Sequence, residues 1–274
     1  MASTAINTTP VRHKVRKSFN DRVLLWLAIG LFLFLYIPIF VLIIYSFNDS
    51  GRGAASVWSG FTLSWYSEVF NNTAIINATK VSLWVAFWST VVSTIIGTLT
   101  AIAMERFRFW GKVTYDAILY LPIIIPDIVM ALSTLLFFVM LDLALSRYTI
   151  LIAHIAFNIA FVAIVVRARL ADMDSNLEEA AADLGANPWE TFRRVTLPLL
   201  LPGIISGALL AFTLSLDDFV ITFFVAGPGS TTLPVQVYSM IRFGITPEVN
   251  AISTLLFLGS TLLVIISLVL QRRT

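Results

Sequence analysis

Six long runs of apolar residues, separated by short polar segments, dominate the sequence. They lie near residues 23–47, 76–104, 115–140, 148–168, 199–225 and 249–270. Each is long enough to cross the hydrocarbon core of a bilayer, which takes about 20 helical residues. The pattern predicts an all-α membrane protein whose six transmembrane helices fill residues 23–270. The first run is too long for a signal peptide and no cleavage site of small residues follows it, so we expect an uncleaved span.

Charged residues support this interpretation and orient the chain. Only 12% of residues are charged and 58% are hydrophobic, whereas soluble domains have about 25% charged residues. Of the 18 Lys and Arg residues, 14 lie in the tail 1–22, in the loops 105–114 and 167–198, or after residue 270. The positive-inside rule makes these segments cytoplasmic, and with six spans it places both termini there. The basic surplus therefore reflects membrane topology, and we expect no nucleic-acid partner.

Residues that bend or join helices recur inside the apolar runs. The prolines are Pro38, Pro122, Pro126 and Pro202. Small residues at four-residue spacing are Ser89, Ser93, Gly97 and Ala101 in the second run and Gly203 and Gly207 in the fifth. Prolines at membrane depth are tolerated where helices shield one another or line a cavity, and small residues permit close helix contact. We therefore expect a packed bundle.

Catalytic and metal-binding chemistry has few candidates. The chain has no cysteine and only two histidines, His13 and His154. No nucleophile–base cluster or metal-ligand set is recognisable, so an intramembrane enzyme is disfavoured and we expect no catalytic residue and no metal site. We interpret His154 and Asn158 as an interhelical hydrogen-bonding pair. Trp58, Trp65 and Tyr66 are interpreted as an interfacial aromatic belt, with cation–π contact to an amine as the alternative.

The loop 172–198 has the signals of a helix–turn–helix. Asp174 or Ser175 can cap a first helix, and Glu178 and Glu179 suit its positive end. Gly185 then provides a left-handed stop. The second helix has three starting signals, a capping residue, a first-position proline and a capping-box glutamate: Asn187, Pro188 and Glu190. Such an ordered loop offers a docking surface.

The same loop resembles the signature of inner-membrane permeases of binding-protein-dependent ABC importers. The matching positions are Glu179, Ala180, Ala181, Gly185, Val195, Leu197 and Pro198. Val195 stands where the family has isoleucine, which is a difference of one methylene. The resemblance implies the type I permease fold. It also implies that the first loop helix, with Glu179 at its signature, inserts into a cleft on an ATPase subunit.

The resemblance also implies partners. The chain has no G-x-x-x-x-G-K-[ST] motif, so we expect ATP and Mg to bind to a separate ATPase subunit, present in two copies, and no cofactor in this chain. A second homologous permease and a periplasmic or extracellular solute-binding protein complete the expected importer. The chain itself belongs in the bacterial inner membrane, surrounded by lipid.

Acidic residues inside the spans suggest what is carried. Asp127 lies in the third run, and Asp217 and Asp218 lie in the fifth, with Thr213 on the helix face of Asp217. Neither run contains Lys or Arg, so these carboxylates favour a path for a cationic, hydrogen-bonding solute. The alternatives are that the acids lie in water at helix ends, or pair with the partner subunit, or relay protons in an ion-driven secondary transporter.

A narrower resemblance supports the cationic solute. Ser215–Phe219, Gly227–Gly229, Thr232–Pro234 and Phe243–Ala251 resemble the spermidine/putrescine permeases, as do Tyr45–Asn48 and Leu63–Tyr66 near the first outer loop. Within that group the chain is similar to the second permease of the pair. The resemblance implies polyamine import, with another small solute as the alternative.

Overall fold

The structure is a computed structural model that describes residues 19–51, 57–174, 176–242 and 244–272. Most of the basic tail, Ser175 and Phe243 lie outside these ranges. The chain forms two units, one ending at Ile44 and one starting at Tyr45. The first unit contains the apolar helix α1 (Phe19–Tyr45) except for its last residue, and the side chains of this helix are largely exposed. Within the described ranges the remaining regular structure is helical, apart from an isolated bridge between Asn48 and Phe61.

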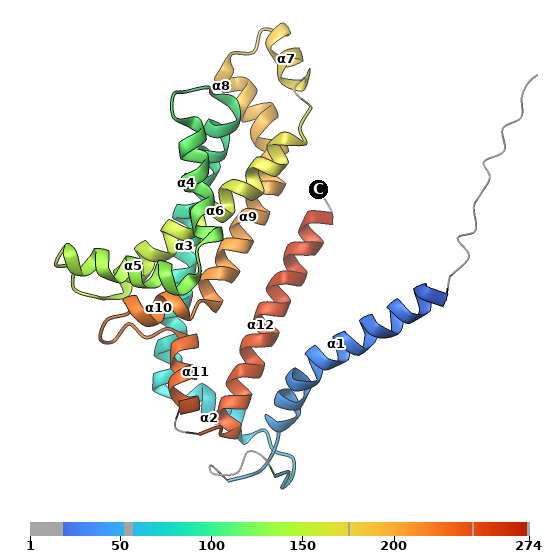
Figure 1. The fold of residues 1–274 in the computed structure, drawn as a ribbon, viewed down its shortest axis with the longest axis vertical. Helices are drawn as coiled ribbons and strands as arrows, with labels where there is room; N and C mark the ends of the chain where they lie inside the picture. Colours follow the sequence, from blue (N-terminus) through green and yellow to red (C-terminus); the bar gives the residue numbers. More distant parts are fainter. Residues whose placement is uncertain (1–18, 52–56, 175, 243, 273–274) are drawn as a thin grey trace, which may run out of the picture. The chain divides into compact units, whose positions relative to one another are not determined.

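Three long helices form the centre of the second unit. They are α3 (Thr73–Arg106), α6 (Arg147–Ala171) and α9 (Leu197–Asp217), and each packs against the other two (Figure 1). A Cβ atom added to Gly97 of α3 would lie 2.8 Å from the Cβ atom of Val162 in α6, and one added to Gly207 of α9 would lie 3.3 Å from Val162 Cγ1. The close helix contact predicted from the small residues is therefore confirmed.

The third apolar run, expected as one span near 115–140 with prolines that break or kink it, is divided into two helices. It forms α4 (Lys112–Ile124) and α5 (Asp127–Met140), which are bent by 110° relative to each other. Pro126 has no amide hydrogen, and it restricts the preceding Ile125 to the extended backbone seen here. Five helices are long and apolar enough to span a membrane, or six if the bent pair is one span.

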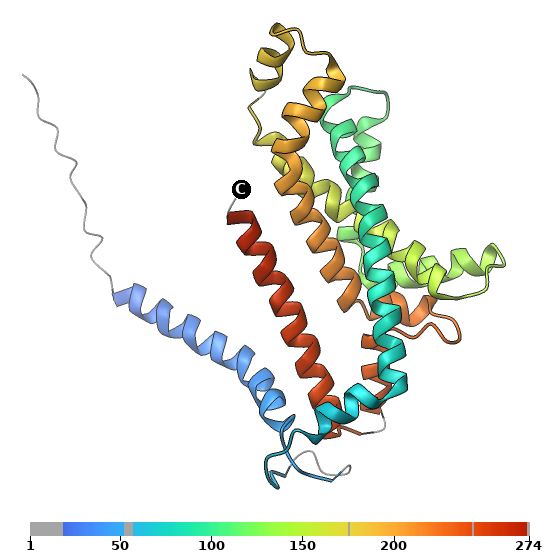
Figure 2. The same ribbon diagram turned by 180° about the vertical axis from the view of Figure 1, so that it is seen from behind.

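The fifth run also breaks earlier than expected. The prediction of one helix over 199–225 is wrong, because α9 ends at Asp217 and a separate helix α10 (Val220–Val225) follows. The last long helix, α12 (Pro247–Arg272), packs against α9 and against two short helices, α2 (Ser64–Asn71) and α11 (Leu233–Arg242), that the apolar pattern did not predict (Figure 2).

One part of the aromatic-belt interpretation is wrong. Trp65 is buried at 6% exposure in the cluster that joins α2, α3, α11 and α12. Its indole nitrogen donates a hydrogen bond of 2.9 Å to the carbonyl of Asn48. Tyr66 forms a hydrogen bond with Ser46, whereas Trp58 is 48% exposed. Trp65 therefore stabilises the packing of these helices and does not face a membrane interface.

Candidate functional site

The break between α4 and α5 positions Asp127. It is the first residue of α5, directly after Pro126, whose carbonyl accepts from the amides of Val129 and Met130. The carboxylate therefore lies at the positive end of the α5 dipole, which favours negative charge. Among the described residues the Asp127 side chain has no hydrogen bond and no ion pair, so its charge is available to a ligand.

The break between α9 and α10 positions Asp218. Its backbone is extended, and its carboxylate accepts from the amide of Ile221 at 3.3 Å and from the amide and hydroxyl of Thr222 at 2.8 Å each. These bonds satisfy amide hydrogens at the start of α10 that have no partner within the helix. Asp218 is thus held by its own chain, where the sequence had suggested the partner subunit as one possible contact.

A buried histidine completes the support of Asp218. His154, fully buried in α6, has Nε2 3.2 Å from Asp218 Oδ2 and 3.0 Å from Thr222 Oγ1. Its Nδ1 is 2.7 Å from Ser215 Oγ, which in turn accepts from Ser89 of α3 at 3.0 Å. The network joins four helices, α3, α6, α9 and α10, so the interhelical role predicted for His154 is confirmed.

The interhelical hydrogen-bonding role predicted for Asn158 is wrong. Asn158 is fully buried one turn along α6, but neither polar atom of its amide group has a hydrogen-bond partner in the part of the chain that the structure describes. The predicted spacing placed both side chains on one face of α6, yet only His154 forms hydrogen bonds with polar residues of α9, α10 and the segment between them. Sequence spacing does not reveal which neighbour each turn of a helix meets.

Residues at the break between α4 and α5 and at the break between α9 and α10 line one cavity of about 340 Å³. Its polar residues are Asp127, Thr213, Asp217 and Asp218. Its apolar residues are Pro122, Met130, Phe157, Phe161, Leu214, Phe219, Val220 and Ile221. All four residues singled out in the sequence for a substrate path therefore surround one space, although they come from α5, α9 and the segment after α9. The aromatic residues of this cavity were not anticipated.

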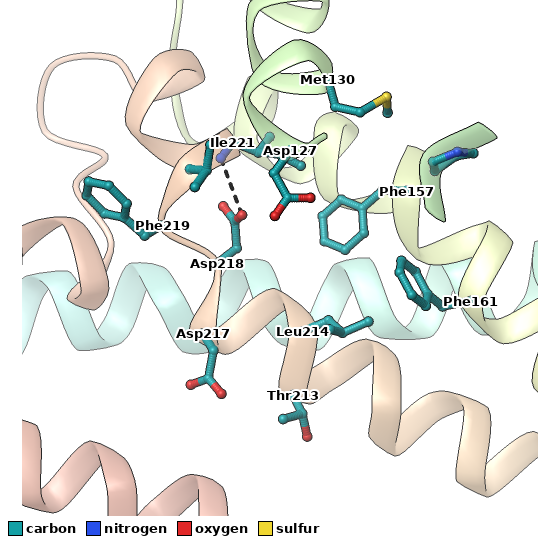
Figure 3. A pocket seen from close by; sticks show the side chains of 12 residues that line it. Asp127, Met130, Phe157, Phe161, Thr213, Leu214, Asp217, Asp218, Phe219 and Ile221 are labelled. Carbon is teal, nitrogen blue, oxygen red and sulfur yellow. Dashed lines mark hydrogen bonds between the residues drawn. The ribbon is translucent and has the colours of Figure 1, made fainter. Parts of the chain in front are cut away.

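The carboxylates do not all face the same way. In Figure 3, Asp127 and Asp218 point towards each other, whereas Asp217 and Thr213 point to the opposite side of the α9 ribbon. Asp217 is exposed and accepts a hydrogen bond of 3.0 Å from Ser260 of α12. The predicted shared face of Thr213 and Asp217 agrees with this arrangement. The acids at the two helix breaks thus form two groups, Asp127 with Asp218 and Asp217 with Thr213 on the other side of α9.

A second candidate site lies in the loop between α6 and α9. Helix α7 (Asn176–Asp183) begins with an amide hydrogen bond from Asn176 to Asp174 and is followed by Gly185 at φ +87°, as predicted. Helix α8 (Pro188–Thr191) has the predicted capping box between Asn187 and Glu190.

The loop differs from the prediction where α8 ends. It continues through the π-helical turn η1 (Phe192–Thr196) into α9, so the second loop helix is the start of the fifth span. Figure 1 shows α7 and α8 at the same end of the unit as the connection between α3 and α4. Glu179 and Ala180 are exposed, Ala181 and Leu197 are half-buried, and Pro198 is exposed.

Comparison with known proteins identifies the class. Residues 93–274 match the family model described as binding-protein-dependent transport system inner membrane component. The chain is 43% identical over 243 residues to the spermidine/putrescine transport system permease protein PotC of Escherichia coli (strain K12), covering 89% of this chain and 91% of the relative. It is 45% identical over 232 residues to the putrescine transport system permease protein PotI of the same strain, covering 82% of each.

More distant relatives agree on the fold. The putative 2-aminoethylphosphonate transport system permease protein PhnV of Salmonella paratyphi A is 30% identical over 86% of this chain and 88% of the relative. A bacterial ABC transporter that imports the acidic polysaccharide alginate matches with a TM-score of 0.73 at 20% identity, covering 94% of this chain and 96% of that one. The chain is a member of the family of inner membrane components of binding-protein-dependent transport systems.

Proposed function

We propose that this chain is the second of two homologous permeases in an ATP-driven importer and carries a polyamine, such as spermidine or putrescine, into the cytoplasm. The observation that carries the substrate class is the pair Asp127 and Asp217, which form no ion pair within the described residues although they lie at helix breaks in a membrane domain. Charge at such positions is costly, so it points to a function. The names of the relatives PotC and PotI support the same class.

The cavity suits the alternation of charge and methylene groups along a polyamine. Carboxylates attract the ammonium groups, while Phe157, Phe161 and Phe219 provide apolar surface for methylenes and ring faces for cations. Thr213 donates its hydroxyl proton to the carbonyl of Leu209, which leaves its oxygen lone pairs free to accept from an ammonium. Asp218 is already engaged by His154 and Thr222, so we assign it mainly to holding the break open.

The remaining assignments follow from the charge pattern and the loop. With α4 and α5 as one bent span the chain has six, and the positive-inside rule then places both termini in the cytoplasm. Helix α7, with the exposed Glu179 and Ala180, lies on that side as the docking element for one of two copies of an ATPase subunit, which would bind ATP and Mg. A solute-binding protein outside would deliver the substrate.

The test is uptake by the complex reconstituted in proteoliposomes, with radiolabelled spermidine, putrescine and 2-aminoethylphosphonate as alternative substrates. Asp127→Asn and Asp217→Asn keep shape and remove one charge each. A loss of about 1 kcal/mol of attraction corresponds to roughly a fivefold loss of uptake. We expect the loss to be larger for the triamine than for the diamine, because a triamine meets more carboxylates.

Asp142→Asn is the matched control. Asp142 lies in the turn after α5, outside the cavity, and its φ of +54° is one that asparagine adopts readily. Uptake at the wild-type rate by Asp127→Asn, Asp217→Asn and Asp218→Asn, for every amine, would rule out the acidic path. Uptake of the phosphonate in preference to both amines would overturn the substrate class.

A further inference from the structure

Helix α7 has two adjacent glutamates with different surroundings. Glu179, which belongs to the family signature, is exposed and forms no hydrogen bond within the described residues. The side chain of Glu178 is 19% exposed, and its Oε1 atom accepts from Arg106 Nη2 and from Thr196 Oγ1, the latter at 2.6 Å. Neighbouring helical residues differ in direction by about 100°, so one glutamate faces outward while the other faces the membrane helices.

The partners of Glu178 are the ends of two membrane helices. Arg106 is the last residue of α3. Thr196, which is buried at 6% exposure, is the last residue of the π-helical turn η1, immediately before α9 begins at Leu197. The carboxylate therefore links α7 to α3 and α9, the helices that carry Ser89 and Ser215 of the His154 network.

Apolar packing cannot fix α7 in this position. The helix has eight residues, and none of them is buried. A helix of that length is marginal by itself, so its placement depends on its contacts with the rest of the chain. A partly buried, charge-assisted hydrogen bond to Arg106, combined with the bond to Thr196, provides such a contact. The π-helical turn beside it is a local irregularity of a type that often occurs at functional sites.

We propose that Glu178 is a positioning residue that makes α7, the end of α3 and the start of α9 move together. A displacement of α7 by the ATPase then reaches both membrane helices at once through the Arg106–Glu178–Thr196 contact. The inference rests on the proposed function, because it assumes that α7 docks on an ATPase. Glu178 itself faces away from that docking surface, so its effect is on coupling and not on ATPase binding.

The experiment compares transport with ATP hydrolysis in the reconstituted complex. We expect Glu178→Ala to assemble with the ATPase and hydrolyse ATP at the wild-type rate, but to import at least fivefold less spermidine per ATP. Glu178→Gln keeps an acceptor for Thr196 and loses the ion pair, so its loss should be smaller. Arg106→Glu should also lower the ratio of spermidine imported to ATP hydrolysed. Arg106→Glu combined with Glu178→Arg restores the ion pair but not the acceptor for Thr196, so it should recover part of the import per ATP that Arg106→Glu alone loses.

Arg108→Glu is the control for charge reversal, because Arg108 is exposed and its side chain forms no hydrogen bond or ion pair among the described residues. It should leave the ratio unchanged. A wild-type ratio in Glu178→Ala, or no recovery in the double reversal, would overturn the inference. Loss of the ATPase from Glu178→Ala would also overturn it, since the residue would then be a docking contact. Failure of the wild-type complex to bind an ATPase or to import spermidine would instead contradict the proposed function.

Discussion

The glycine at position 97 offers a strict test of the packing at the centre of the bundle. Gly97→Ala adds one methyl group where α3 meets α6. Its Cβ would lie 2.8 Å from Val162 Cβ, 2.9 Å from Val162 Cγ1 and 3.0 Å from the carbonyl oxygen of Ile159. Ordinary contacts of this kind begin at 3.4 Å, so the two helices must separate by ~0.6 Å near this point.

The expected cost follows from that geometry. Overpacking a close-packed interior typically costs about 1–3 kcal/mol. At Gly207 the same change brings Cβ no closer than 3.3 Å to Val162, and we expect a loss of about 1 kcal/mol or less. At Gly259 of α12 nothing lies within 4 Å, so Gly259→Ala should be neutral or stabilising, by up to about 1 kcal/mol, through helix propensity.

The assay is the free energy of unfolding in mixed micelles, measured by SDS titration of each purified variant. Stability should fall in the order Gly259→Ala, Gly207→Ala, Gly97→Ala. Val162→Ala should not rescue Gly97→Ala, because alanine keeps the Cβ atom that forms the shortest contact and the Ile159 carbonyl stays in place. Equal stability of all three glycine variants, or full rescue by Val162→Ala, would refute the packing argument.

Two further predictions concern topology and the loop before α9. Because the chain has no native cysteine, Val235→Cys in α11 can be labelled selectively. A membrane-impermeant thiol reagent should modify this cysteine only from outside the cell. Labelling only from inside would contradict the predicted orientation. Gly185 has φ +87°, a backbone conformation that asparagine tolerates and leucine does not. Gly185→Leu should therefore insert into the membrane normally but lose transport and retain less ATPase subunit. Gly185→Asn should keep most of the transport and most of the bound ATPase subunit. Normal transport by Gly185→Leu would contradict a docking role for this loop.

The local features of this protein could be read from the sequence. Long apolar runs give membrane helices because the bilayer leaves backbone groups no partner outside the helix. The left-handed Gly185 and the capping box of Asn187 and Glu190 depend on residues within a few positions of one another, and both are present as predicted. The family signature in the same loop has fixed spacing, so it too was visible without a structure.

The features that join distant segments were decided by the tertiary structure. Pro126 signalled an interruption, but a 110° bend that brings Asp127 to Asp218 depends on how α5 packs against α10. Nothing near Glu178 in the sequence indicates that it contacts the membrane helices, because its partner Arg106 is 72 residues away. Asp218 became a cap for α10 and a partner of His154 only because α9 ends one residue earlier. Spacing along one helix gives the face of a residue, but the neighbour that this face meets is a property of the packed bundle.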